Sequence, residues 1–297
     1  MSKLNYLVLS LGLVLASACS KKHEPAGATG GSGSATVSAG SAETGSGSGS
    51  AGSGSAAAEA PPAPYTPAAD VPEPIKAAVA AEDRSIDDRR LDAGRMPAEV
   101  LAFFKVAPGQ KVGELFAGGG YTTELMARVV GDGGKVYAQN TKEILDRFAR
   151  KPWEARAAKP VMKNVVGVER PTDDPFPPEA KDLDAVITIL NYHDFVWQKA
   201  DMAKLNKTVF ASLKKGGVYG IVDHSAEVGS GTRDVETLHR IDEEAVKKEV
   251  LAAGFKLDGE SDVLRHADDK RDWNSSPKAA GEKRGKSDRF TLRFVKP

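Results

Sequence analysis

The chain has 297 residues, and its 41 basic and 41 acidic side chains give a formal charge of zero. Its Lys and Arg residues are interspersed with acids rather than gathered in stripes, which argues against a nucleic-acid partner. The single cysteine cannot form a disulfide bond within the chain. These properties predict one folded domain of moderate size that binds no nucleic acid and contains no disulfide.

Residues 1–18 have the layout of a secretory signal. Lys3 comes before an apolar stretch, and small residues then lead to Cys19. The apolar stretch has about half of the ~20 residues that a membrane-spanning helix needs. The segment resembles a bacterial lipoprotein signal, in which a peptidase cuts before a lipid-modified cysteine. Ala16 stands where leucine is usual, and Leu15 lies one place further back.

The lipoprotein resemblance implies a lipid on Cys19 that attaches the protein to a membrane of the bacterial envelope. Ser20 after the cysteine points to the outer membrane, with the protein facing the periplasm. Two alternatives stay open. The segment is an ordinary secretory signal with a chance cysteine, or the start codon of a cytoplasmic protein has been assigned too early.

Residues 19–69 are rich in Gly, Ser and Ala and poor in large apolar side chains. Such a composition cannot offset the entropy of ordering, so we predict a disordered linker. Residues 70–106 have apolar side chains at helical spacing and predict an N-terminal group of helices, one of which begins at Pro97.

From residue 107 to 297 the pattern becomes strand, loop and helix in repetition. The predicted helices after the first strand are 121–130, 141–150, 200–217 and 241–255, with Thr141 and Asp242 as caps. The predicted strands are 111–116, 135–140, 164–169, 183–190, 217–225, 255–264 and 288–297. This alternation predicts a doubly wound, Rossmann-like α/β fold with a seven-stranded, mostly parallel sheet. Ligands of such sheets bind at the carboxyl ends of the strands.

The stretch VGELFAGGG ends the first strand in a glycine-rich turn. Glycines let a backbone approach a ligand closely, and the next helix offers free N–H groups there. The second strand ends about twenty residues further on, at Asn140, where the ribose of a nucleotide would lie. The candidate cofactor-binding residues are Glu114, Ala117, Gly118, Gly119, Gly120 and Asn140.

These motifs resemble the class I S-adenosylmethionine-dependent methyltransferases. VGELFAGGG is similar to their first motif, KVYAQN to their second-strand motif and LKKGGVYGIVDH to their fifth-strand segment. DRRLDAGRMPAEVLAFF, GGGYTTE, NYHDF, LHRID and SDRFTLRF together resemble a bacterial group of predicted methyltransferase-like proteins that often carry export signals. The resemblance covers about residues 82–297 and implies S-adenosylmethionine as cofactor.

Two positions depart from the family pattern. Phe116 stands at the usual first glycine, so we expect the turn to begin differently there. Asn140 stands where an acid usually holds the ribose hydroxyls. A hydrogen bond to a charged partner contributes about 1.5–3 kcal/mol and a neutral one about 0.5–1.5 kcal/mol. We therefore expect Asn140 to bind ribose more weakly than an acid would.

The segment NYHD follows the fourth strand, where methyltransferases place their catalytic loop. It offers four candidate catalytic residues, which are Asn191, Tyr192, His193 and Asp194. His193, with Asp194, would act as a base or would orient the substrate. In the alternative interpretation, His193 and Asp194 only cap the following helix and hold the loop.

His224 and His239 complete the candidate catalytic residues, because both lie at a predicted strand end or in an adjoining loop. Imidazoles and a carboxylate could also bind zinc or iron. No pair has compact ligand spacing, so we predict no metal site, and a metal-dependent enzyme stays a third hypothesis.

The leading hypothesis is an S-adenosylmethionine-dependent methyltransferase that is anchored by lipid and acts on a small molecule. The cofactor is made in the cytoplasm, so an exported domain would need a separate supply. The alternative is a non-catalytic or divergent protein of the same fold that binds another envelope ligand.

Overall fold

The computed structural model describes residues 65–297. The predicted signal over 1–18, the lipidation site Cys19 and the predicted linker up to residue 64 lie outside the described residues. Within this described part, no helix combines the length and the apolar character that crossing a membrane requires.

One mixed sheet forms the centre of the fold. Its strands are β1 (Lys111–Leu115), β2 (Lys135–Asn140), β3 (Val165–Glu169), β4 (Leu183–Ile189), β5 (Leu213–His224), β6 (Lys256–Ser261) and β7 (Arg289–Val295). Their order is β3-β2-β1-β4-β5-β7-β6. The first five strands run parallel, and β7 pairs antiparallel with both β5 and β6. The predicted seven-stranded, mostly parallel sheet is confirmed.

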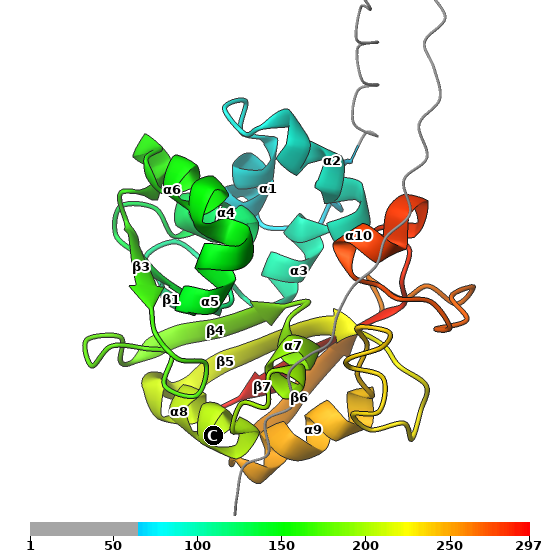
Figure 1. The fold of residues 1–297 in the computed structure, drawn as a ribbon. Coiled ribbons are helices and arrows are strands. Elements are labelled where there is room, and N and C mark those ends of the chain that lie inside the picture. The colour runs from blue at the N-terminus through cyan, green and yellow to red at the C-terminus, as the bar shows by residue number, and fades with distance from the viewer. Residues whose placement is uncertain (1–64) are drawn as a thin grey trace, which may run out of the picture. The chain divides into compact units, whose positions relative to one another are not determined.

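Helices cover both faces of this sheet (Figure 1). One face carries α1 (Glu73–Ala80), α2 (Ile86–Arg95), α3 (Pro97–Phe103), α4 (Tyr121–Val130) and α6 (Arg150–Ala157). The other carries α7 (Tyr192–Trp197), α8 (Met202–Ser212) and α9 (Glu243–Ala252). Short connecting elements are α5 (Lys142–Ile144), η1 (Leu145–Ala149), η2 (Pro160–Met162), α10 (Pro277–Ala280) and η3 (Gly281–Lys283).

The central strands are buried on both faces, which explains their nearly continuous apolar sequence. Side chains alternate along β4, so Ala185 and Ile187 belong to the core under α1, α3 and α4. Val186 belongs to the core under α7, α8 and α9. The topology therefore brings the carboxyl ends of β1, β4 and β5 to one edge between two helical layers.

Local signals set several helix ends as predicted. Pro97 is the first residue of α3, and the preceding Met96 has the left-handed φ of 45° that breaks the helical run. The Thr141 hydroxyl accepts from Ile144 N, and the Asp242 carboxylate accepts from Glu244 N. These caps satisfy backbone donors that the first turn of a helix leaves free.

The helix predicted over 200–217 is wrong at its C-terminal end. Helix α8 stops at Ser212, and the chain from Leu213 onward belongs to β5. The buried Leu213 pairs with Leu183 of β4, and the register then shifts before Ala185. Pairing with a distant strand therefore overrides the helical preference of the lysines that follow Leu213.

Residues 65–69, which we predict as the end of the linker, contact α3. The Tyr65 hydroxyl donates to the Glu99 carboxylate and accepts from Ala98 N at 3.0 Å. Ala68 N donates to Glu99 Oε1 at 2.8 Å. This stretch is therefore hydrogen-bonded to the helix that packs under β5.

Candidate functional site

The glycine-rich turn begins at Phe116, directly after β1. Phe116 has a φ of 50°, which is the left-handed conformation that glycine adopts easily. We expected the turn to begin differently at this position, and in the structure it begins with this phenylalanine in the left-handed conformation. This backbone conformation costs about 1–2 kcal/mol in a residue with a Cβ, and two contacts stabilise it. Phe116 N donates to Gln139 Oε1 at 3.2 Å, and its ring packs edge-on against Phe195 at 4.7 Å.

Gly118 presents an open face. It has a φ of 55°, and a Cβ added there would meet no atom within 4 Å. On its other side the Asn140 side chain clamps the turn, because Asn140 Oδ1 accepts from Gly118 N at 2.8 Å and Nδ2 donates to Gly118 O at 3.3 Å. Asn140 is only 1% exposed. The polar atoms of the Asn140 side chain are therefore hydrogen-bonded to the turn, although the sequence pattern predicts that they bind a ribose.

The rest of the turn supports helix packing. A Cβ on Gly120 would lie 2.8 Å from the Arg156 side chain of α6, so only glycine fits there. Arg156 Nε donates to Gly119 O at 2.6 Å, and its guanidinium pairs with Asp88 and Glu124. Ala117 N donates to Gln139 O at 2.9 Å. The turn is thus fixed to α6 and β2, while Gly118 stays open.

Glu114 lies beneath the turn and is 4% exposed. The Thr123 hydroxyl of α4 donates to Glu114 Oε2. Burial raises the pKa of Glu114 to about 7, although the bond from Thr123 opposes that rise. In the structure this acid therefore ties β1 to the first turn of α4.

The NYHD segment leads from β4 into α7, next to the glycine turn. Asn191 Nδ2 donates to Ile189 O at 2.8 Å and to Phe116 O at 3.2 Å. The side chain of Asn191 therefore joins the loop after β4 to the turn after β1. It makes no capping bond to α7.

Tyr192 does not join the other candidate catalytic residues. Its side chain is fully buried in the core under α7, α8 and α9. The phenol donates to Glu249 Oε2 at 2.8 Å and accepts from Asn206 Nδ2 at 2.8 Å. This placement gives Tyr192 a packing role, because the helical turn points it away from its neighbour His193.

His193 is held by Asp223, the penultimate residue of β5. Asp223 Oδ1 lies 2.7 Å from His193 Nδ1, and Oδ2 accepts from His193 N at 2.8 Å. A carboxylate only accepts hydrogen bonds, so Nδ1 carries the proton and Nε2 is left as the acceptor of a neutral imidazole. Asp223 therefore fixes both the position and the tautomer of His193.

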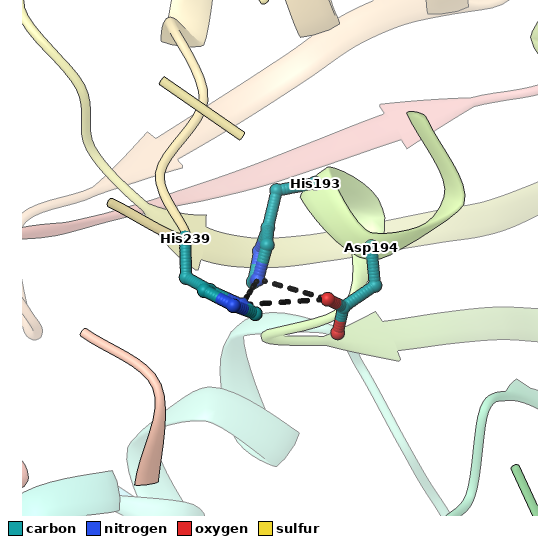
Figure 2. A group of neighbouring side chains, drawn as sticks. All are labelled: His193, Asp194 and His239. Carbon is teal, nitrogen blue, oxygen red and sulfur yellow. Dashed lines mark hydrogen bonds and ion pairs between the residues drawn. The ribbon is translucent and has the colours of Figure 1, made fainter. Parts of the chain in front are cut away.

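The fold brings Asp194 and His239 to the same place, and Figure 2 shows the three side chains converging. His193 Nε2 lies 3.2 Å from His239 Nδ1 and 3.3 Å from Asp194 Oδ1. His239 Nδ1 lies 3.6 Å from Asp194 Oδ1. We call His193, Asp194 and His239 the histidine–aspartate cluster. Helix α7 supplies two members, and the loop before α9 supplies the third.

His239 reaches the cluster because the loop after β5 folds back along the strand. A parallel bridge joins Ser225 to Ile241, and Ile241 N donates to His224 O at 3.0 Å. Next to His239, the fully buried Arg240 pairs with Asp269 at 2.8 Å. Arg240 is therefore a structural support for the loop.

Electrostatics distinguish the buried His193 from the half-buried His224 at this edge. Burial disfavours the charged form of His193, but Asp223 and Asp194 outweigh it and raise its pKa above the ordinary value. Burial lowers the pKa of His224 well below the ordinary value, and the nearby His193 lowers it further. His224 Nδ1 lies 2.7 Å from Ser287 Oγ, and its ring centroid is 5.9 Å from that of His193. His224 is therefore a neutral neighbour of the cluster.

Asp223 is not among the candidate catalytic residues predicted from the sequence. One feature of the sequence could have indicated it: Asp223 is an acid near the end of the otherwise apolar strand GVYGIVDH. A carboxylate buried in such a strand needs a hydrogen-bonding partner. Sequence cannot name that partner, because His193 lies thirty positions away in the chain.

A partly open hollow lies at the same edge of the sheet, on the α4 side. Its lining includes Arg95, Tyr121, Leu190, Val222 and Arg289. The Arg95 guanidinium stacks over the Tyr121 ring at 4.5 Å. The hollow is therefore mainly apolar, with two cationic side chains at its wall.

No protein-family model matches the chain, and no curated protein sequence matches it. Solved structures do match. A candidate sarcosine dimethylglycine methyltransferase from Galdieria sulphuraria is 17% identical with a TM-score of 0.50, over 76% of this chain and 91% of that one. An S-adenosylmethionine-dependent methyltransferase from Aquifex aeolicus is 18% identical with a TM-score of 0.49, over 71% of this chain and 97% of that one.

At these identities the likeness establishes the fold alone. The chain has the Rossmann-like fold of the class I S-adenosylmethionine-dependent methyltransferases. Activity, cofactor and substrate must be argued from the residues at the edge of the sheet.

Proposed function

We propose that the protein is an S-adenosylmethionine-dependent methyltransferase that acts on a small molecule. The observation that carries the proposal is the joining of two features at one edge of the sheet. The open face of Gly118 lies in the turn after β1, and the histidine–aspartate cluster follows β4. A bond from Asn191, two residues before His193, to Phe116 O, two residues before Gly118, joins the two chain segments that carry them.

The turn fits the cofactor at two points. Gly118 leaves room above the backbone, and the N-cap of α4 is Gly120, which makes no side-chain cap, so the first N–H groups of the helix are available to an anionic group. The open face of Gly118 would admit the cofactor, and the first N–H groups of α4 would hold its anionic group. When bound, S-adenosylmethionine supplies a methyl group that its sulfonium charge already activates.

The chain's own residues would orient the acceptor and remove its proton. Asp223 holds His193 so that the unprotonated Nε2 faces the cluster, where it can accept a proton. Asp194 lies beside it with a side chain that is 22% exposed.

The proposal predicts that the full-length chain binds S-adenosylmethionine and S-adenosylhomocysteine, and that Gly118→Val abolishes binding. A valine at Gly118 would fill the open face, so we expect affinity to fall at least about 100-fold, or roughly 2.7 kcal/mol. Calorimetric titration of the unmodified chain and the variant measures this change.

Gly109→Val is the matched control. Gly109 also has a positive φ, 80°, and open space around its Cβ, but it lies before the start of β1. Both variants therefore introduce backbone strain, and only Gly118→Val should lose the ligand. Equal affinity in both variants, or no binding by the unmodified chain at millimolar ligand, would count against the proposal.

One observation favours a second function, in which the fold binds another envelope ligand without transferring methyl groups. The polar atoms of Asn140 are already hydrogen-bonded to Gly118. Asn140 would therefore bind the ribose hydroxyls more weakly than an acid would. A chain that binds neither form of the cofactor in the titration would support this second function.

We also propose that Cys19 carries a lipid that attaches the protein to the bacterial envelope, where it faces the periplasm from the outer membrane. The support is the order of Lys3, the apolar stretch and the small residues before Cys19. The lipid would anchor the catalytic domain to a membrane surface.

A further inference from the structure

We propose that the histidine–aspartate cluster binds a divalent transition-metal ion of the zinc type. Its ligands would be His193 Nε2, Asp194 Oδ1 and His239 Nδ1. This inference goes beyond methyl transfer, and the ion site stands whether or not the chain is a methyltransferase.

The spacing of the three atoms carries the proposal. They are separated by 3.2, 3.3 and 3.6 Å. In a tetrahedral zinc site with bonds of about 2.0–2.1 Å, any two ligand atoms are about 3.3–3.4 Å apart. The three atoms thus form a triangle of the size that one face of such a tetrahedron requires. Two imidazoles and one carboxylate are also a ligand set that this class of ion prefers.

The surroundings of His193 are those of a metal ligand. Protein ligands of this kind usually donate their second ring N–H to a carboxylate, which fixes the ring and its tautomer. Asp223 does this for His193 through the 2.7 Å contact at Nδ1. Asp223 is fully buried, and besides this contact its carboxylate accepts from His193 N and His224 N, so it is held firmly in place.

The charges at the centre of the cluster also require a cation or a proton. The lone pair of His193 Nε2 and the Asp194 carboxylate face each other at 3.3 Å. Two acceptors at this distance repel each other unless something positive lies between them. An ion at the centre would satisfy both acceptors and His239 Nδ1 together. Without an ion, a proton on His193 Nε2 or on His239 Nδ1 would have to lie between these acceptors.

His239 is held toward this centre at an energetic cost. It has a φ of 49°, which is unfavourable for a residue with a Cβ. Ser275 Oγ donates to His239 O at 2.5 Å, and the Trp197 ring lies 5.4 Å from the imidazole. Strained backbone of this kind is concentrated at binding and catalytic sites, where the surrounding structure maintains it.

Three protein ligands leave the fourth position of a tetrahedral ion open, as in catalytic rather than structural zinc sites. An oxygen of water or of an acceptor molecule could bind there and lose its proton more easily. With the ion bound, His193 Nε2 would be a ligand, and the ion would take over the activation of the acceptor.

The test is titration of the metal-stripped, full-length chain with Co²⁺, followed by visible absorption, and with Zn²⁺, followed by calorimetry. We expect one ion per chain and the strong visible bands of tetrahedral Co²⁺. His239→Ala and Asp194→Asn each remove one ligand, so affinity should fall at least about 100-fold. Asp223→Asn keeps all three ligands and should weaken binding about 10–100-fold.

His266→Ala is the matched control, because His266 lies against Arg289 outside the cluster. It should bind Co²⁺ as the unmodified chain does, which would show that His266 does not contribute to binding. Circular dichroism and thermal unfolding establish that each variant is folded, and Asp194→Asn provides a nearly isosteric change if His239→Ala does not fold. Absence of tetrahedral Co²⁺ bands, or equal affinity in folded Asp194→Asn and the unmodified chain, would overturn the proposal.

Discussion

Glu114 shows at the scale of one residue how burial changes chemistry. Its pKa is raised to about 7 in the folded chain, whereas an exposed glutamate titrates near 4.5. Between these pH values the folded state keeps a proton that the unfolded state has lost. The free energy of unfolding therefore falls as the pH rises through this window. Each pH unit between two pKa values corresponds to about 1.4 kcal/mol.

Glu114→Gln should remove this pH dependence. Glutamine keeps the shape and cannot ionise, so the variant should gain about 3 kcal/mol relative to the unmodified chain between pH 4.5 and 7. Denaturant unfolding of both proteins across this range measures the difference, and contributions from other groups cancel. Parallel pH profiles would show that Glu114 does not hold a proton in the folded chain.

Helix α6 is fixed at the scale of elements by its contact with the glycine turn. Gly120→Ala would place a Cβ 2.8 Å from Arg156 Cδ and 3.2 Å from Trp153. Arg156 cannot move away freely, because Gly119 O and the Asp88 carboxylate hold it. We expect a strain of about 1–2 kcal/mol and a further cost of about 1–3 kcal/mol from overpacking.

Gly109→Ala separates these two contributions. Its φ of 80° is close to the 81° of Gly120, but a Cβ there meets nothing within 4 Å. Only the strain should therefore remain, and the midpoint of denaturant unfolding should fall further in Gly120→Ala. Equal losses in the two variants would mean that α6 does not press on the turn.

The elements also show what the sequence can and cannot predict. Caps and helix starts such as Pro97, Thr141 and Asp242 depend on neighbouring residues, so local patterns identify them. The extended conformation at Leu213 depends on pairing with a distant strand. The glycine-like backbone of Phe116 depends on a ring and an amide from other elements. Such tertiary contacts leave no local signal.

The same distinction holds for the site. The glycine turn and the NYHD loop follow strands, so the parallel topology predicts that they meet at one edge. The approach of His239 to His193 depends on a loop that returns along β5 and bridges to Ser225. Only the folded structure shows this return of the loop. Only the folded structure shows that Asp223 is the partner of His193.

At the scale of the whole molecule, the lipoprotein proposal predicts where the chain is found. Cys19→Ser removes the only cysteine, so the variant should no longer take up a labelled fatty acid and should leave the membrane fraction. Cell fractionation with metabolic labelling measures both effects, and Ser20→Ala serves as the neighbouring control. Label that persists in Cys19→Ser would contradict lipid attachment at this position.

The central claim is that the edge of the sheet around Gly118 binds the methyl-donating cofactor beside the histidine–aspartate cluster. A crystal structure of the chain with S-adenosylhomocysteine tests it most directly. We predict that the ligand lies over Gly118, with its sulfur atom toward His193. A ligand bound elsewhere, or an empty turn at saturating ligand concentration, would contradict the claim.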